Sequence, residues 1–177
     1  MASLGRLLRS VVRLLSRPAA PRSLPPVAPA GQGPSGEDQP GRYGPHATVE
    51  VDPSRIGPVR MVYSPSTDGN PDPGEIVWTW VPYEESDGRG KDRPVLRVAG
   101  QGGDVMAVAL TSKPHGDASS FVSIGRGSWD SQERPSWVGV ERIFRVYPDG
   151  MRREAAALDA ARFSRVADVL SARYGWR

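Results

Sequence analysis

Short runs of β-branched and aromatic residues, each bounded by glycine, proline or other turn-forming residues, dominate the middle of this chain. They predict β-strands at residues 75–83, 94–100, 104–112, 120–125 and 136–147. No helical pattern alternates with these runs, which argues against a parallel doubly wound sheet. Short strands separated by frequent turns predict a mainly β fold, either a small barrel or a strongly curved sheet.

The flanking segments extend this pattern. Residues 47–51 and 56–63 are further predicted strands, and a Tyr-Pro-Asp-Gly turn at 147–150 predicts that residues 151–158 return as a hairpin partner. A terminal helix is predicted between a capping Asp159 and a stopping Gly175. Its apolar stripe consists of Phe163, Val166, Ala167, Leu170 and Tyr174.

The first part of the chain has a different composition. Five of the 23 basic residues and none of the 20 acidic residues lie in residues 1–36, so the net positive charge belongs to this tail and not to the predicted barrel. Residues 1–17 form a basic amphipathic pattern, which fits a loose tail or misassigned start, a surface or partner-binding helix, or a targeting segment. The expected organisation is this segment, a disordered Pro/Gly-rich linker at 18–45, an extension docked on the barrel at 46–72, and a barrel domain at 73–177.

Several kinds of site are excluded or disfavoured by composition. The chain has no cysteine and two histidines, so disulfides and thiolate sites are excluded and a zinc site lacks ligands. No glycine-rich phosphate loop or dinucleotide fingerprint is present. No apolar run reaches the length of a membrane span. We therefore expect no metal, no cofactor and no membrane span.

The remaining chemistry lies where two predicted strands begin and end. Arg93-Pro94 stands at the threshold of one strand, and Thr111-Ser112-Lys113 at the exit of another. An arginine fork and hydroxyl donors suit a phosphate, and Pro94 at a strand's first residue forgoes a ladder hydrogen bond. The competing interpretation is a surface ion pair of Arg93 with Asp92 or Glu84, which spacing alone favours.

The tryptophans leave two interpretations open. Trp78 and Trp80 lie two residues apart and share one face of their strand. That face is either core, which we expect, or a platform on which bases stack. Trp129 and Trp137 flank a polar segment and are either packing residues or residues at the rim of the barrel.

Three segments in order, GEIVWTWVPYEESDGRGKDRPVLRVAG, VMAVALTSK and SWVGVERIFRV, resemble the PemK/MazF toxins of bacterial toxin–antitoxin systems. The resemblance covers about residues 73–174. It implies a homodimeric SH3-like barrel and a metal-independent endoribonuclease that cuts single-stranded RNA at short sequences. It also implies a cognate antitoxin as partner and a cytoplasmic location.

The resemblance also implies roles for residues. The family's catalytic arginine falls on Arg93 and its catalytic Thr/Ser on Thr111, and the attacking group is the RNA's own 2′-hydroxyl. The general base is open among Glu84, Glu85 and His115. The RNA-binding candidates are Ser112, Lys113, Glu84, Trp80, His115, Arg97 and Arg142.

Two departures from the family pattern leave alternatives open. Where relatives carry Gln-x-Arg this chain has Arg142-Ile143-Phe144, so a second basic contact comes from Arg142 or Arg145 or is missing. Arg97 replaces an apolar residue and is expected either to line the RNA groove or to meet a dimer partner. The alternative function is a catalytically silent barrel that binds nucleic acid or protein. A barrel that poisons DNA gyrase is a weaker possibility, because such toxins do not use this Arg–Thr pair.

Overall fold

A computed structural model describes residues 39–66, 72–101, 104–113 and 119–177, and the predictions for residues 1–38 lie outside this part of the chain. The elements follow one another as β1 (Val49–Val51), β2 (Glu75–Pro82), β3 (Gly90–Gln101), β4 (Asp104–Thr111), β5 (Phe121–Gly125), β6 (Ser136–Val146), a 3₁₀ turn (Pro148–Gly150), β7 (Arg152–Ala157) and α1 (Ala160–Tyr174). The predicted mainly β fold with one C-terminal helix is confirmed.

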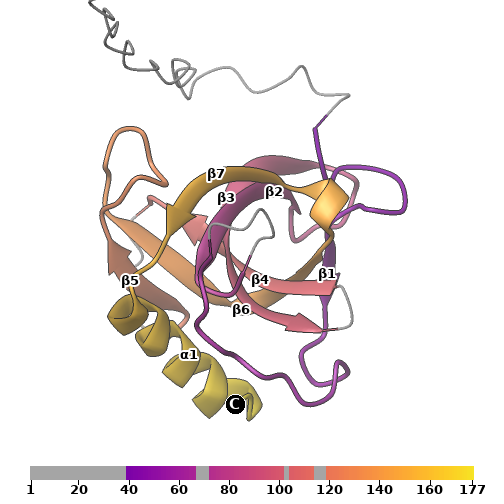
Figure 1. The fold of residues 1–177 in the computed structure, drawn as a ribbon. Coiled ribbons are helices and arrows are strands. Elements are labelled where there is room, and N and C mark those ends of the chain that lie inside the picture. Colours follow the sequence, from indigo (N-terminus) through magenta and orange to yellow (C-terminus); the bar gives the residue numbers. More distant parts are fainter. Residues whose placement is uncertain (1–38, 67–71, 102–103, 114–118) are drawn as a thin grey trace, which may run out of the picture.

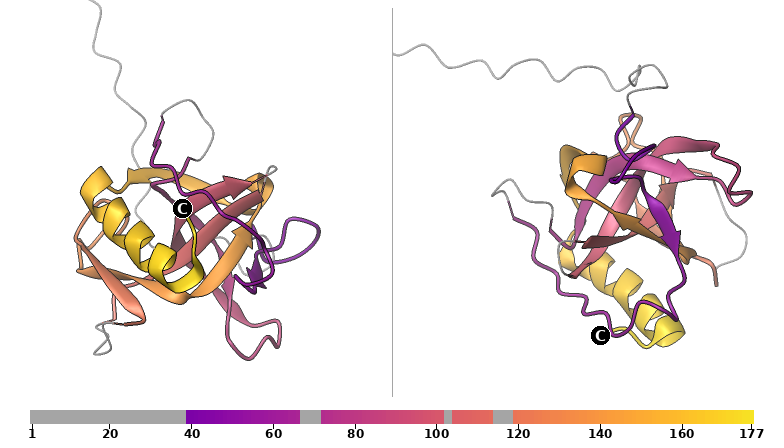
Figure 2. Two further views of the ribbon diagram at one scale, coloured as in Figure 1. Left: turned by 90° about the horizontal axis from the view of Figure 1, so that it is seen from below. Right: turned by 90° about the vertical axis from the view of Figure 1, so that its right-hand side faces the viewer.

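One antiparallel sheet contains all seven strands in the order β1-β6-β4-β3-β2-β7, with β5 paired to β6. The sheet curls into a small barrel, and α1 lies against one side of it (Figures 1 and 2). We call the side covered by α1 the helix face and the opposite side the far face. Alternation along each strand decides which side chains lie on which face.

Apolar side chains fill a core on each face. The helix-face core combines strand residues with the buried stripe of α1, and includes Ile76, Leu96, Val108, Leu110, Ile143, Phe163, Val166 and Leu170. The far-face core consists of Val77, Val81, Val95, Val105, Ala107, Phe144 and Val146. Because both faces are buried near the middle of the sheet, the central strands read as continuous apolar runs in the sequence.

Helix α1 begins and ends where the sequence predicts. The Asp159 carboxylate accepts a hydrogen bond from the Arg162 backbone N–H at 2.8 Å, which caps the first turn. Gly175 adopts a left-handed conformation with φ of 70°, and its N–H donates to the Ser171 carbonyl.

The predicted hairpin between residues 136–147 and 151–158 is wrong. The turn at Pro148–Gly150 exists, but β7 pairs with β2 instead of β6. The β6 strand is already paired with β1, β4 and β5, so β7 crosses to the free edge of β2. A buried hydrogen bond of 2.6 Å from the Thr79 hydroxyl to the Gly150 carbonyl holds the turn against β2.

The predicted strand at 56–63 is also wrong, since the segment is extended without belonging to the sheet. It contains Gly57, whose φ is 75°, followed by Pro58, which cannot donate to a ladder. The segment runs beside the C-terminus (Figure 2), where the Arg177 N–H donates to the Val59 carbonyl at 2.9 Å. The Tyr63 hydroxyl donates to the Leu158 carbonyl at 2.8 Å, which fastens the segment next to α1.

Candidate active site on the far face

Arg93 lies on the far face of β3, directly opposite Thr79 of β2. Its side chain is half-buried, and within the described residues it makes no hydrogen bond or ion pair. The ion pair expected as the competing interpretation is absent: the Asp92 carboxylate instead accepts from Arg152 of β7 at 2.7 Å, and Glu84 is exposed in the β2–β3 loop. Arg93 is therefore held by the strand while its guanidinium stays available to a ligand.

The sequence predicts that Pro94 is the first residue of its strand. In the structure β3 starts earlier, at Gly90. Pro94 instead marks the point where β3 loses one of its two neighbours. The pairing with β4 ends at Val95 and Ala109, whereas the pairing with β2 continues to Gly90. A proline has no N–H to donate to a neighbouring strand. It is tolerated here because no residue of β4 pairs with Pro94. Arg93 thus lies one residue beyond the point where the two strands separate.

Thr111 is the last residue of β4 and shares the far face with Ala107 and Ala109. Val95 and Ala109 are the last pair of β3 with β4, so Arg93 and Thr111 each lie two residues beyond it and, by alternation, on the far face. The two predicted catalytic residues therefore lie on neighbouring strands and on one face.

The residues after Thr111 lead away from the sheet. The Thr111 hydroxyl accepts a hydrogen bond from the Lys113 backbone N–H at 3.2 Å, which closes a short turn. Ser112 is half-buried and Lys113 is exposed, so both are next to the site but leave the sheet plane. His115 lies outside the described residues.

Arg142 also lies on the far face, with its guanidinium 5.0 Å from the centre of the Phe144 ring. It donates to the Glu50 carboxylate of β1 at 2.6 Å and to the Pro82 carbonyl at the end of β2 at 2.9 Å. Arg145, the other candidate for a second basic contact, follows Phe144 and projects to the opposite face. Of these two candidates, Arg142 is therefore the one on the candidate face, and the Glu50 carboxylate, from before the family-like region, already binds it.

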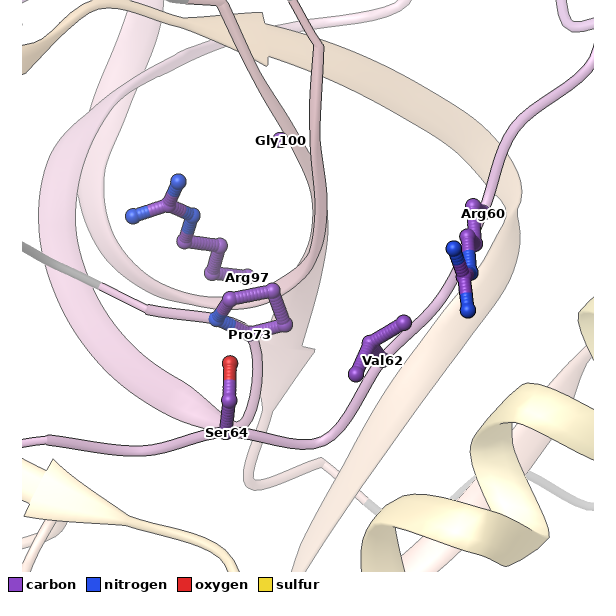
Figure 3. Close-up of a pocket in the computed structure, with 6 residues that line it drawn as sticks. All are labelled: Arg60, Val62, Ser64, Pro73, Arg97 and Gly100. Atoms are coloured by element: carbon purple, nitrogen blue, oxygen red, sulfur yellow. The ribbon is translucent and has the colours of Figure 1, made fainter.

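Arg97 is on the same face of β3 as Arg93, but four residues away, which corresponds to about 13 Å along a strand. It lines a pocket of about 280 Å³ together with Arg60, Val62, Ser64, Pro73 and Gly100 (Figure 3). Its backbone carbonyl accepts from the Gly74 N–H at 2.9 Å. Val95 of the far-face core lies between Arg97 and Arg93 on β3.

Trp80, an RNA-binding candidate from the sequence, does not lie on the face of this site. It pairs with Asp92, whereas Thr79 pairs with Arg93, so Trp80 lies on the face opposite Arg93. Its ring packs over Gly90 and under the Arg42 guanidinium, whose central carbon is 4.4 Å from the ring centre. Trp78 shares this face, and both side chains are only partly buried. The expected core interpretation is wrong too, because Val77, Thr79 and Val81 are the buried set.

The loop between β2 and β3 contains an exposed ion pair between Asp87 and Arg89. Hydrogen bonds from the Arg89 backbone N–H and from its side chain lower the pKa of the Asp87 carboxylate. Glu84 and Glu85 are exposed in the same loop.

In the described ranges, no group of three or more His, Asp or Glu side chains gathers as in a metal site. No helix of the described residues is long and apolar enough to cross a membrane.

The sequence did not predict a buried hydroxyl contact on β2, at the residue that pairs with Arg93. The Thr48 and Thr79 hydroxyls are 2.7 Å apart, and Thr79 is the direct cross-strand neighbour of Arg93. Gly41 packs so closely on these hydroxyls that a Cβ there would lie 2.3 Å from Thr79 Oγ1. A polar Thr79 between Val77 and Val81 is the one signal in the sequence that pointed to it.

Known proteins give a consistent comparison. Residues 72–173 match the family model described as the PemK-like, MazF-like toxin of type II toxin–antitoxin system. No curated protein matches the chain. A mycobacterial endoribonuclease in complex with its cognate antitoxin is 19% identical with a TM-score of 0.47, covering 60% of this chain and 96% of its own.

Two other solved structures are similar at the same level. MazF from Deinococcus radiodurans is 19% identical with a TM-score of 0.46, covering 59% of this chain and 96% of its own. The Mycobacterium tuberculosis toxin MazF-mt6 is 15% identical with a TM-score of 0.42, covering 58% and 98%. On the family match, which spans more than half of its length, this chain belongs to the PemK-like, MazF-like toxins of type II toxin–antitoxin systems.

Proposed function

We propose that this toxin is a metal-independent endoribonuclease that cleaves single-stranded RNA at short sequences, with Arg93 and Thr111 as catalytic residues. The observation that carries the proposal is the combination of family membership with an Arg93 guanidinium that has no partner within the described residues. Arg93 and Thr111 both lie two residues beyond the last β3–β4 pair, on the far face. A structural arginine in the same position would be expected to hold a carboxylate, and the adjacent Asp92 holds Arg152 instead.

In the proposed reaction the RNA supplies its own nucleophile. The ribose 2′-oxygen forms a bond to the adjacent phosphorus, and the bond from phosphorus to the 5′-oxygen of the next nucleotide breaks. The products are a 2′,3′-cyclic phosphate and a 5′-hydroxyl end. One proton leaves the 2′-hydroxyl and one is delivered to the departing 5′-oxygen.

The protein's part in this reaction is positioning and charge stabilisation. The Arg93 fork can donate two hydrogen bonds to the non-bridging phosphate oxygens, where negative charge develops. The Thr111 hydroxyl can orient the same phosphate without adding charge. Glu84 and Glu85 lie exposed in the loop at the Arg93 end of β2 and β3, so they are the candidates for the general base among the described residues.

The proposed partners are single-stranded RNA, a cognate antitoxin and a second copy of the chain, with the cytoplasm as the site of action. Family membership supports an antitoxin, since the matched family is defined by type II toxin–antitoxin systems. In such a system the antitoxin would hold the enzyme inactive until it is removed.

The proposal is tested by incubating the purified chain with single-stranded RNA in EDTA and analysing the ends of the products. We expect fragments with 2′,3′-cyclic phosphate and 5′-hydroxyl ends. A matched RNA with 2′-O-methyl groups should stay intact, because the nucleophile is blocked. Binding of RNA without cleavage under any condition would reject the enzyme in favour of a silent binding barrel.

A further inference from the structure

The row of residues that contains Arg93 and Thr111 continues beyond them onto β6 and β5. Thr111 pairs directly with Trp137 of β6, and Trp137 pairs with Ser123 of β5. The next residues inward, Leu110 and Val138, pair on the helix face and belong to its core. Trp137 therefore projects from the far face, immediately beside the proposed catalytic threonine.

Trp137 is more exposed than the residues of the two cores. Its side chain is partly exposed, and it belongs to neither core. In the described part of the chain, no other aromatic ring pairs with the Trp137 ring and no arginine stacks on it. Trp129, by contrast, is 4% exposed with the Arg162 guanidinium 5.8 Å from its ring centre. Of the two tryptophans left open by the sequence, Trp129 is packing and Trp137 lies at the surface beside the site.

A second aromatic residue extends the surface next to Trp137. Phe121 pairs with Gly139, two residues along β6 on the same face. A Cβ at Gly139 would lie 3.3 Å from Phe121 Cε1, so the Phe121 ring lies over the glycine. Diagonal neighbours of this kind are about 7–8 Å apart, within reach of two large aromatic side chains. Trp137 and Phe121 thus form an aromatic surface on β5 and β6.

We propose that Trp137, supported by Phe121, is a base-stacking platform for the nucleotide next to the scissile phosphate. The inference rests on the proposed RNA cleavage. Every nucleobase has a π-face, and stacking on an aromatic side chain is tolerant of sequence. One strand spacing, about 4.8 Å, separates the backbone of Trp137 from that of Thr111, so a base attached to a phosphate held at Arg93 and Thr111 is within reach of the ring. The platform therefore sets affinity for the substrate and leaves the bond cleavage to the Arg–Thr pair.

The test measures binding of a fluorescein-labelled 2′-O-methyl oligonucleotide of mixed sequence, which cannot be cleaved, to the full-length chain. Trp137→Leu should weaken its binding by about 5- to 150-fold, the range expected for one lost stack. Trp137→Phe retains an aromatic face and should bind within about threefold of the original chain. Trp78→Leu is the matched control, because Trp78 is partly exposed on the opposite face.

A second measurement needs no substitution and guards against a variant that misfolds. The unmodified chain is photocrosslinked to the same oligonucleotide carrying 4-thiouridine, and the adduct is mapped by mass spectrometry. An adduct at Trp137 or Phe121 supports the platform. Adducts confined to Trp78 and Trp80, or unchanged binding by a folded Trp137→Leu, overturn it. If the chain binds this oligonucleotide but leaves unmodified single-stranded RNA intact, only the proposed reaction is rejected. If it cleaves unmodified RNA and Trp137→Leu binds the oligonucleotide as tightly as the original chain, only the platform is rejected.

Discussion

At the scale of single residues, the Arg93 guanidinium is available to a ligand because the nearby carboxylates already bind other arginines. Four arginines around β2 and β3 already have acceptors or aromatic rings: Arg42 stacks on Trp80, Arg89 binds Asp87, Arg142 binds Glu50 and Arg152 binds Asp92. These contacts occupy the four arginines. Arg93 is left without such a contact in the described residues.

The resemblance names Arg93 and Thr111 as catalytic candidates and Trp80 as an RNA-binding candidate, but the structure has Trp80 on the face opposite Arg93. Alternation showed that Trp78 and Trp80 share a face, yet it could not show which face, because that depends on pairing with another strand. The register of Thr79 with Arg93 settles the question. Trp137 was left between two interpretations for the same reason, since only its pairing with Thr111 shows what lies beside it.

Thr111 provides a test of the hydroxyl itself. Thr111→Val keeps the branched shape and removes the hydroxyl, so we expect the cleavage rate to fall by about tenfold or more, with the melting temperature nearly unchanged. Thr111→Ser keeps the hydroxyl and should retain most of the rate. Single-turnover cleavage of a labelled RNA measures both. A Thr111→Val enzyme as fast as the original would exclude a role for the hydroxyl.

At the scale of elements, the segment before the family-like region completes the barrel. Strand β1 pairs with β6, the Trp80 N–H donates to the Pro40 carbonyl, and Thr48 meets Thr79 in a buried hydroxyl contact. The positions of the central strands and the caps of α1 were readable from local patterns, whereas the strand predicted at 56–63 was wrong. The crossing of β7 to β2 was not, because hairpin turn chemistry is local whereas the choice of a free strand edge depends on the whole sheet.

The buried hydroxyl contact predicts a measurable loss of stability. Thr79→Val leaves the Gly150 carbonyl and the Thr48 hydroxyl without their partner, so we expect unfolding to become easier by about 1–3 kcal/mol. Chemical denaturation of Thr79→Val, Thr48→Val and the double variant forms a cycle. The double variant should cost less than the sum of the single ones. Strict additivity would show that the two hydroxyls do not interact.

The N-terminal cap of α1 gives a second test at this scale. Asp159→Ala removes the acceptor for the Arg162 N–H and should destabilise the fold by about 0.5–2 kcal/mol. Asp159→Asn retains a capping oxygen and should cost less. Thermal unfolding of the two variants side by side measures the difference, and equal losses would mean that charge rather than capping matters at this position.

At the scale of the whole molecule, the family resemblance predicts a homodimer. Sedimentation equilibrium of the purified full-length chain should give twice the 19.1 kDa of one chain. A monomer at all accessible concentrations would contradict this prediction without affecting the assignment of Arg93 and Thr111. Oligomeric state could not be derived from the sequence pattern, because no single residue in it marks an interface.

The most direct test of the account is the cleavage of single-stranded RNA in EDTA by the original chain, Arg93→Ala and Arg55→Ala. Arg55 is an exposed arginine paired with Asp52, and it serves as the matched control for loss of one positive charge. We expect the Arg93 variant to lose about 100-fold or more of the rate, because the phosphate loses its charged donor. The Arg55 variant should cleave at about the original rate. Undiminished cleavage by a folded Arg93→Ala chain would contradict the assignment.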